Sequence, residues 1–324
     1  MEDLSDYKSH LKRSQSLIAL VLMITIMSFL SDRFFTVTNM WNVTRQISVN
    51  VCLSVGMTLV ILTGGIDLSV GSVLALTGAI AAGLLKNGLE LPMFNLAIRY
   101  TFLGAAMGAI LAGSILGLIN GLAITRFRVP PFVATLAMLT IARGLTMLWT
   151  KGFPITGLGE TFAVLGTGSF LAIPVPVWIC AVIVAVALVV TKRTRFGRYV
   201  YAVGGNEQAA KLSGLNINKI KLMVYTAAGA LAAIGGLITT ARLDSAQPNA
   251  GMGYELDSIA AVVIGGTSLS GGRGSVLGTV LGALIIGVLN NSLVLLDVSP
   301  FWQQVIKGGV ILLAVVIDKL SAKD

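Results

Sequence analysis

Apolar runs dominate this chain, and they constrain its fold more than any other feature. The first covers Leu17 to Leu30 and, at about 14 residues, is short for a crossing, so we expect it to extend back through Ser14. Several later runs reach the roughly 20 residues that a helix needs to cross a bilayer. Only 11% of the 324 residues are Asp, Glu, Lys or Arg, whereas a soluble domain carries about a quarter. The sequence therefore predicts an integral membrane protein.

The apolar runs predict about ten spans in a single transmembrane domain, residues 1–324. Ser258 to Gly266 is too short to cross as one regular helix, and an even number of spans returns both termini to one side. After the first run the predicted segments are Ile47 to Leu62, Val70 to Leu85, Leu96 to Ile124, Pro131 to Trp149, Pro174 to Val190, Leu222 to Ala241, Ser258 to Gly266, Val276 to Leu296 and Phe301 to Ile317.

Basic residues orient these spans, because Lys and Arg concentrate in cytoplasmic loops of membrane proteins. Most of them fall on the side of both termini, and the most basic loop covers residues 192–221. We therefore expect cytoplasmic termini and a cytoplasmic loop, with lipid headgroups as neighbours. The net charge of +9 follows from this topology. Because the basic residues form no continuous basic face, we expect no nucleic-acid partner.

The sequence gives no support for an enzyme, a metal site or a cofactor. GGTSLSGGRGS at residues 265–275 has the glycines of a phosphate-binding loop, but Arg273 and Gly274 stand where that motif needs Lys and Ser or Thr. His10 is the only histidine, and no Cys or carboxylate set has metal-ligand spacing. Cys52 and Cys180 lie inside apolar runs, so we expect no disulfide.

An internal similarity predicts glycine-broken helices. VILTGGIDLSVGSVLALTGAI at residues 60–80 resembles VVIGGTSLSGGRGSVLGTVLGAL at residues 262–284. Apolar segments interrupted by glycine in matching places of two halves are typical of transporters, in which free backbone groups face a cavity or protein. An offset of six spans predicts parallel copies; an inverted repeat would mean that a weak span, first of all Ser258 to Gly266, is wrong. Glycines four residues apart, such as Gly113, Gly117 and Gly121, predict closely packed helices.

Ionisable and polar residues within the spans are the candidates for a buried network or a solute path. A charge in hydrocarbon costs about 2.5–3.5 kcal/mol on insertion scales, so we expect such residues to face protein or water. For Arg143, Asp257 and Lys307 we favour a structural network over a contact with the solute, and for Asp67 a helix cap or a contact between loops. Amide and aromatic side chains suit a neutral polar solute better, although they also join helices. These path candidates are Asn50, Asn120, Asn290, Asn291, Trp302, Gln303 and Gln304.

The polar stretch GGNEQAAKLSGLNINKIK at residues 204–221 lies in the most basic loop. Asn206 and Gly214 are typical ends of a two-turn helix, and Asn216 or Asn218 can cap the next span. A solvated loop that binds headgroups would explain the charges, but defined caps build a rigid shape that suits docking on a soluble partner. The expected docking residues are Asn206, Glu207, Gln208, Ala210, Lys211, Leu212 and Gly214.

That stretch, with ARLDSAQPNAGMGYELDSIAAVVIGGTSLSGGRGSVLGTVLGALIIGVLNN and GMTLVILTGGIDLSVGSVLALTGA, closely resembles permease subunits of bacterial ABC importers for ribose and related monosaccharides. The resemblance implies an all-α membrane bundle similar to the vitamin B12 importer class. It also implies a permease homodimer in the cytoplasmic membrane, a separate ATP-binding subunit and a soluble sugar-binding protein outside.

The resemblance maps the coupling helix onto Asn206 to Gly214 and brings outer loops such as Arg242 to Leu256 to the binding protein. Ribose is the nearest likeness, and xylose, galactose and a furanose signal molecule remain open. An ion-coupled secondary transporter of a small polar solute remains the alternative.

Overall fold

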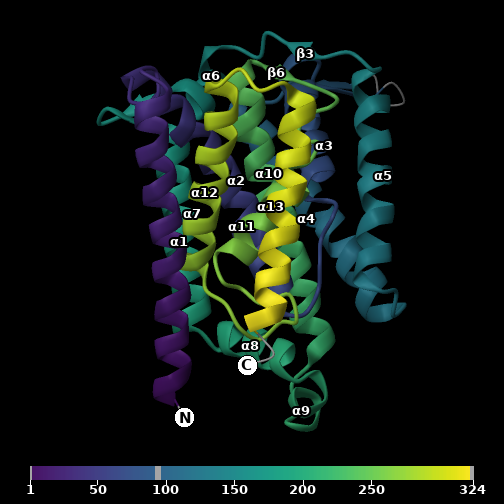
Figure 1. The fold of residues 1–324 in the computed structure, drawn as a ribbon. Helices are drawn as coiled ribbons and strands as arrows, with labels where there is room; N and C mark the ends of the chain where they lie inside the picture. Colours follow the sequence, from purple (N-terminus) through teal and green to yellow (C-terminus); the bar gives the residue numbers. More distant parts are fainter. Residues whose placement is uncertain (1, 92–95, 322–324) are drawn as a thin grey trace. The chain divides into compact units, whose positions relative to one another are not determined.

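A computed structural model describes residues 2–91 and 96–321 (Figure 1). Most of these residues are helical, and the chain divides into two compact units. Unit 1 takes the residues up to 64, residues 184–215 and the residues from 256 onward; unit 2 takes residues 65–183 and 216–255. The α7 helix begins in unit 2 and ends in unit 1.

Unit 1 is built on two long antiparallel helices, α2 and α12. Thr58 and Thr279 join their hydroxyls at 2.7 Å, and near the other ends Asn39 and Asn291 exchange two amide hydrogen bonds of 3.1 and 2.8 Å. Leu20 and Met27 of α1 pack on Ile285 and Val288 of α12. The helices of unit 1 are α1 (Glu2–Leu30), α2 (Val37–Leu62), α8 (Arg195–Gly205), α9 (Glu207–Leu212), α11 (Tyr254–Ile264), α12 (Val276–Leu295) and α13 (Pro300–Ser321).

Unit 2 centres on α10, which packs against both α3 and α4. Its helices are α3 (Val70–Lys86), α4 (Phe102–Arg126), α5 (Pro131–Thr150), α6 (Glu160–Thr167), the first part of α7 (Val175–Arg193) and α10 (Ile217–Leu243). Three short antiparallel strand pairs accompany them: β1 (Leu89–Leu91) with β2 (Leu96–Ile98), β3 (Ile155–Thr156) with β6 (Ser245–Ala246), and β4 (Ser169–Phe170) with β5 (Ile173–Pro174).

Glycines bring the helices of unit 2 into backbone contact. A Cβ on Gly113 would meet the carbonyl oxygen of Gly229, and one on Gly117 would meet that of Tyr225, so α4 and α10 cross without intervening side chains. Gly78 and Gly236 do the same for α3 and α10. Small residues allow such close approach inside a membrane. The predicted role of the glycine spacing in close packing is thereby confirmed.

The helices confirm a polytopic helical membrane protein. Among the described residues, six helices are long and apolar enough to cross a membrane: α2, α4, α5, α7, α10 and α12. Residues 16–30 of α1 and all of α3 are shorter apolar helices. Each predicted span coincides with a helix, but two boundaries were wrong. The fourth helix begins at Phe102, because Leu96–Ile98 pairs with β1, and the second begins ten residues early, at Val37.

The two glycine breaks of the internal repeat meet at one end of unit 1. The first break follows α2, the second separates α11 from α12, and Gly272 N donates to Leu62 O at 3.0 Å between them. In Figure 1 the start of α1, helices α8 and α9, and the end of α13 also lie at a common end of this unit. Residue 1 and residues 322–324, which include the basic Lys323, lie outside the described residues.

Candidate functional site

The predicted polar helix is present as α9, and its caps are those that the sequence indicated. Asn206 Oδ1 accepts from Ala209 N at 2.9 Å, and Gly214 adopts φ +81° just after the helix. Leu215 N then donates to Ala210 O at 3.1 Å, which closes the C-terminal turn. Asn216, the first of the two predicted candidates, caps α10 by accepting from Lys219 N. The segment is therefore a defined helix between two caps.

The α9 helix presents most of its side chains to the surface. Ala210 is buried at 5% exposure, whereas Leu212 is 90% exposed. Glu207, Gln208 and Lys211 are exposed as well. A large apolar side chain exposed between charged neighbours is a typical anchor for a partner protein.

The α8 helix joins α9 to unit 1, and the sequence analysis did not predict it. Asn206 N donates to Ala202 O at 3.1 Å, so this residue ends α8 and begins α9. Val200 and Val203 of α8 are buried. Their spacing and that of Gly197 in RFGRYVYAVGG is helical, and this pattern could have predicted the element.

Backbone contacts between glycines join the end of α8 to both helix breaks. We call this set the glycine junction: Leu62, Gly64, Gly204, Gly271 and Gly272. A Cβ on Gly204 would overlap Leu62 O, and Gly271 lies against Gly204 and Gly64. Both Gly271 and Gly272 have positive φ, +86° and +70°, which favours glycine. The end of α8 therefore contacts the backbone of both breaks without an intervening side chain.

A tyrosine hydrogen bond reinforces the same connection. Tyr201 Oη of α8 donates to Gly274 O at 2.9 Å, beside the start of α12. Burial raises the pKa of the Tyr201 phenol, so the group keeps its proton and remains a donor at physiological pH. The contact therefore holds α8 to the second break.

Of the intramembrane charges predicted to form a network, Asp257 and Lys307 pair with each other, whereas Arg143, which lies in unit 2, bonds backbone carbonyls there. In unit 1, Lys307 Nζ donates to Asp257 Oδ2 at 3.2 Å, and Asn290 Nδ2 donates to the same oxygen at 3.1 Å. In unit 2, Arg143 Nη1 donates to Pro248 O and Ala250 O at 2.7 and 2.9 Å. These charges thus have protein partners.

Asp67 orders the turn before α3. Its Oδ1 accepts from Ser69 N at 2.9 Å and from Ser69 Oγ at 2.6 Å. Asn120 Nδ2 of α4 donates to Ser69 Oγ at 3.0 Å. The N-cap residue of α3 is Ser69, so the buried carboxylate stabilises the turn before the helix and is not itself the predicted cap.

The predicted path residues lie in different environments. Asn120, Asn290 and Asn291 each bond another side chain, as helix-joining amides do. Asn50 is buried, and its Nδ2 has no hydrogen-bond partner among the described residues. On α13, Trp302 is 64% exposed and Gln303 Nε2 donates to Val298 O. The contacts of the three paired asparagines need no solute to explain them.

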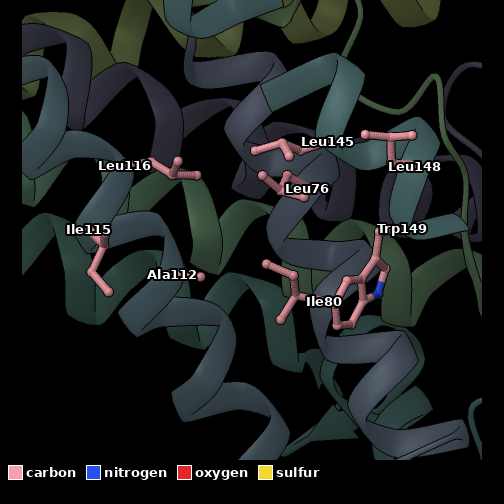
Figure 2. A pocket seen from close by; sticks show the side chains of 8 residues that line it. All are labelled: Leu76, Ile80, Ala112, Ile115, Leu116, Leu145, Leu148 and Trp149. Atoms are coloured by element: carbon pink, nitrogen blue, oxygen red, sulfur yellow. The ribbon is translucent and has the colours of Figure 1, made fainter. Parts of the chain in front are cut away.

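Unit 2 contains two hollows of opposite chemistry. Figure 2 shows the larger, about 500 Å³, lined by apolar side chains of α3, α4 and α5 such as Leu76, Ile115 and Leu148. Its Trp149 Nε1 already donates to Ala79 O. The smaller, about 280 Å³, is lined by Ser72, Arg143, Asn249 and Glu255 with apolar neighbours. Only a hollow with polar groups of this kind suits a hydroxylated solute.

The segment between α10 and α11 is partly buried in its own unit. Of the predicted outer loop Arg242 to Leu256, Ser245, Ala246, Pro248 and Gly251 are buried, and its contact with a binding protein stays a prediction. Gly251 lies against Gly71, near the start of α3. Pro248, Gly251 and Gly253 in so short a stretch could have indicated irregular backbone.

Comparison with known proteins identifies similar permeases. Residues 39–315 match the family described as "Branched-chain amino acid transport system / permease component". The chain is 53% identical to the ribose import permease protein RbsC of Haemophilus influenzae over 94% of this chain and 92% of that one. It is 51% identical to the protein of the same name from Escherichia coli K12, over 96% and 95%, and 49% identical to that of Bacillus subtilis, over 93% and 91%. No solved structure matches the chain.

Proposed function

Since this chain belongs to the family of branched-chain amino acid transport system permease components, we propose that it is the membrane-spanning permease of an ATP-driven importer for ribose. The observation that carries the proposal is about 50% identity, over nearly the full length, to permeases named for ribose import. The chain is a transport subunit, ATP is hydrolysed on a separate subunit, and a substrate-binding partner completes the system.

The site geometry supports ATP coupling rather than ion coupling. An ion-coupled transporter needs an acid that gains and loses a proton or binds a cation within the membrane. Here Asp257 is held by Lys307 and Asn290, and Asp67 by Ser69. Both carboxylates therefore serve structure, and the family assignment removes the ion-coupled alternative.

The coupling helix of the importer is α9, with its flanking caps. Asn206 and Gly214 fix the ends, Ala210 packs inward, and Glu207, Gln208, Lys211 and Leu212 face the partner. Charged groups around an apolar anchor allow one orientation on a groove of the ATP-binding subunit.

The glycine junction carries the motion onward. When the ATP-binding subunits close, α9 moves with α8, because Asn206 belongs to both helices. Gly204 then displaces the ends of both helix breaks, since no side chain lies between the backbones to absorb the shift. Rigid elements that move together around a hinge are the usual basis of alternating access.

The working assembly contains two copies of this single permease domain in the cytoplasmic membrane, with both termini and α9 in the cytoplasm. Basic residues of loop 192–221 lie beside lipid headgroups. The soluble sugar-binding protein docks on the outer face. Among the earlier path candidates, Asn50 and Asn290 each keep one side-chain atom without a hydrogen-bond partner in the described part of the chain, and Trp302 is exposed.

Reconstitution tests the function. Proteoliposomes that contain this permease and its ATP-binding subunit, with ribose-loaded binding protein outside, should accumulate ribose only when ATP is enclosed. Uptake driven by a proton or sodium gradient in liposomes with the permease alone would refute the proposal. Uptake of xylose and galactose, each delivered by its own binding protein, shows how strongly the permease itself discriminates between sugars.

Charge reversal tests the coupling helix. The double variant Glu207→Lys, Lys211→Glu should retain membrane insertion but hydrolyse ATP without ribose uptake, because its charges no longer match those of the partner. The matched control is Lys219→Glu, which changes a basic residue of the same loop beyond α9. Normal uptake in the double variant would show that α9 is a passive loop.

A further inference from the structure

An irregular segment runs along α3 in unit 2. At one end Ala246 packs in a cluster with Ala79 and Ala82 of α3; at the other, Gly251 lies against Gly71. Between these two contacts Ala250 N donates to Gln247 O at 3.0 Å, so the backbone turns at residues 247–250 and continues neither a helix nor a strand. The segment is thus non-helical backbone beside a membrane helix.

The Arg143 guanidinium stabilises this backbone. Its Nη1 donates to Pro248 O and Ala250 O, two carbonyls that no regular helix or strand would satisfy. Arg143 also interacts electrostatically with Glu255, which follows the segment. A guanidinium carries five N–H donors, so this arrangement leaves capacity for a ligand.

Membrane physics limits what such a segment can face. Non-helical backbone at membrane depth is tolerated only where protein buries it or where it lines a water-filled cavity. Asn249 and Gln247 are nevertheless exposed. Amides at this depth do not face lipid, so the segment borders either protein or an aqueous path.

A hollow of about 280 Å³ lies against the segment, and its chemistry is mixed. Ser72, Arg143, Asn249 and Glu255 supply hydroxyl, guanidinium, amide and carboxylate groups, while Leu139 and Met252 supply apolar wall. The volume is just below the range of pockets that hold drug-sized ligands. It therefore suits one small solute with both hydroxyl and C–H surfaces.

We infer that this hollow binds the monosaccharide during its passage through the permease; the inference rests on the proposed importer function. Vicinal hydroxyls of a sugar both donate and accept hydrogen bonds. The Glu255 carboxylate accepts, the Arg143 guanidinium donates, and the Asn249 amide does both. Because the two charges offset each other, the site attracts a neutral solute without retaining an ion.

Cysteine protection tests the site independently of transport rate. In a background with Cys52→Ala and Cys180→Ala, the variants Asn249→Cys and Gln247→Cys are each reconstituted with the complete importer. Thiol modification by a small methanethiosulfonate reagent is followed with and without D-ribose, and with sucrose as a solute control. Gln247 lies two residues away on the same segment but does not line the hollow.

Ribose should slow modification of Asn249→Cys about tenfold at roughly ten times the dissociation constant of the site, and sucrose should not. Gln247→Cys should react equally in both conditions. In addition, Asn249→Ala should lower ribose uptake per ATP hydrolysed about three- to tenfold, because one hydrogen bond to the solute is lost. Gln247→Ala should leave this ratio unchanged.

Equal modification of Asn249→Cys with and without ribose, in an importer that still accumulates ribose, would overturn this inference and leave the proposed function intact. Protection of both cysteines alike would also overturn it, because that result reports a general conformational change. The cysteine-free background and its wild-type parent are assayed in parallel for ATP-dependent ribose accumulation. If only the parent accumulates ribose, the cysteine substitutions have damaged the protein. If neither does, the proposed function is wrong.

Discussion

Lys307 of α13 and Asp257 of α11 form an ion pair with 3.2 Å between Nζ and Oδ2. Their exposures differ: the Asp257 side chain is 4% exposed and that of Lys307 29%. Asn290 of α12 donates to the same carboxylate oxygen, so one acid joins three helices of unit 1.

We predict that Lys307→Met destabilises the protein more than the double variant Lys307→Met, Asp257→Asn. Removal of one partner leaves a buried charge unpaired, at a cost of about 3–5 kcal/mol for fully buried pairs and less here because Lys307 is partly exposed. Chemical-denaturation midpoints of the detergent-solubilised protein measure both. Equal or greater loss in the double variant would contradict the pairing.

The glycine junction predicts different outcomes for two adjacent glycines. Gly204→Ala should abolish most ribose uptake, because its methyl group would overlap Leu62 O. Gly205→Ala should behave almost like the wild type, since a Cβ there meets nothing within 4 Å. Uptake and ATPase activity of the reconstituted importer distinguish them. If both variants transport alike, the junction does not transmit motion.

Helix crossings in unit 2 give a second matched comparison. Gly113→Val should lower the yield of folded protein, because α4 and α10 would have to separate at Gly229. Gly144→Ala on α5 should be tolerated or stabilising by up to about 1 kcal/mol, since alanine has the higher helix propensity and a Cβ there meets nothing within 4 Å. The thermal aggregation temperatures of the two variants in detergent measure which one is less stable. Greater damage from Gly144→Ala would contradict the packing.

Features that depend on residues close together in the sequence were predicted, whereas contacts between residues far apart in the sequence were not. The caps of α9 depend on Asn206 and Gly214, which act within a few residues, so local patterns sufficed. The junction of Gly204 with Leu62 and Gly272 joins residues far apart in the sequence, and no local pattern reports that contact. Span positions followed from hydropathy, whereas the β1–β2 pairing moved the start of α4 to Phe102.

The candidate solute site shows the same limit. Amides inside apolar runs were candidates for the path or for contacts between helices, and Asn120 and Asn291 do bond side chains of other elements. Asn249 lies in a polar stretch that reads as an outer loop. Only the packing of Gly251 on Gly71 and the bonds from Arg143 place that stretch beside α3.

Photo-crosslinking from α9 tests the central claim most directly. A benzophenone amino acid at Leu212, which is 90% exposed, should form an adduct with the ATP-binding subunit in the assembled importer. The same probe at Phe170, an exposed residue on the predicted outer side, should not. We predict a Leu212 adduct whose yield changes when ATP binds; its absence from an importer that still accumulates ribose would contradict the account.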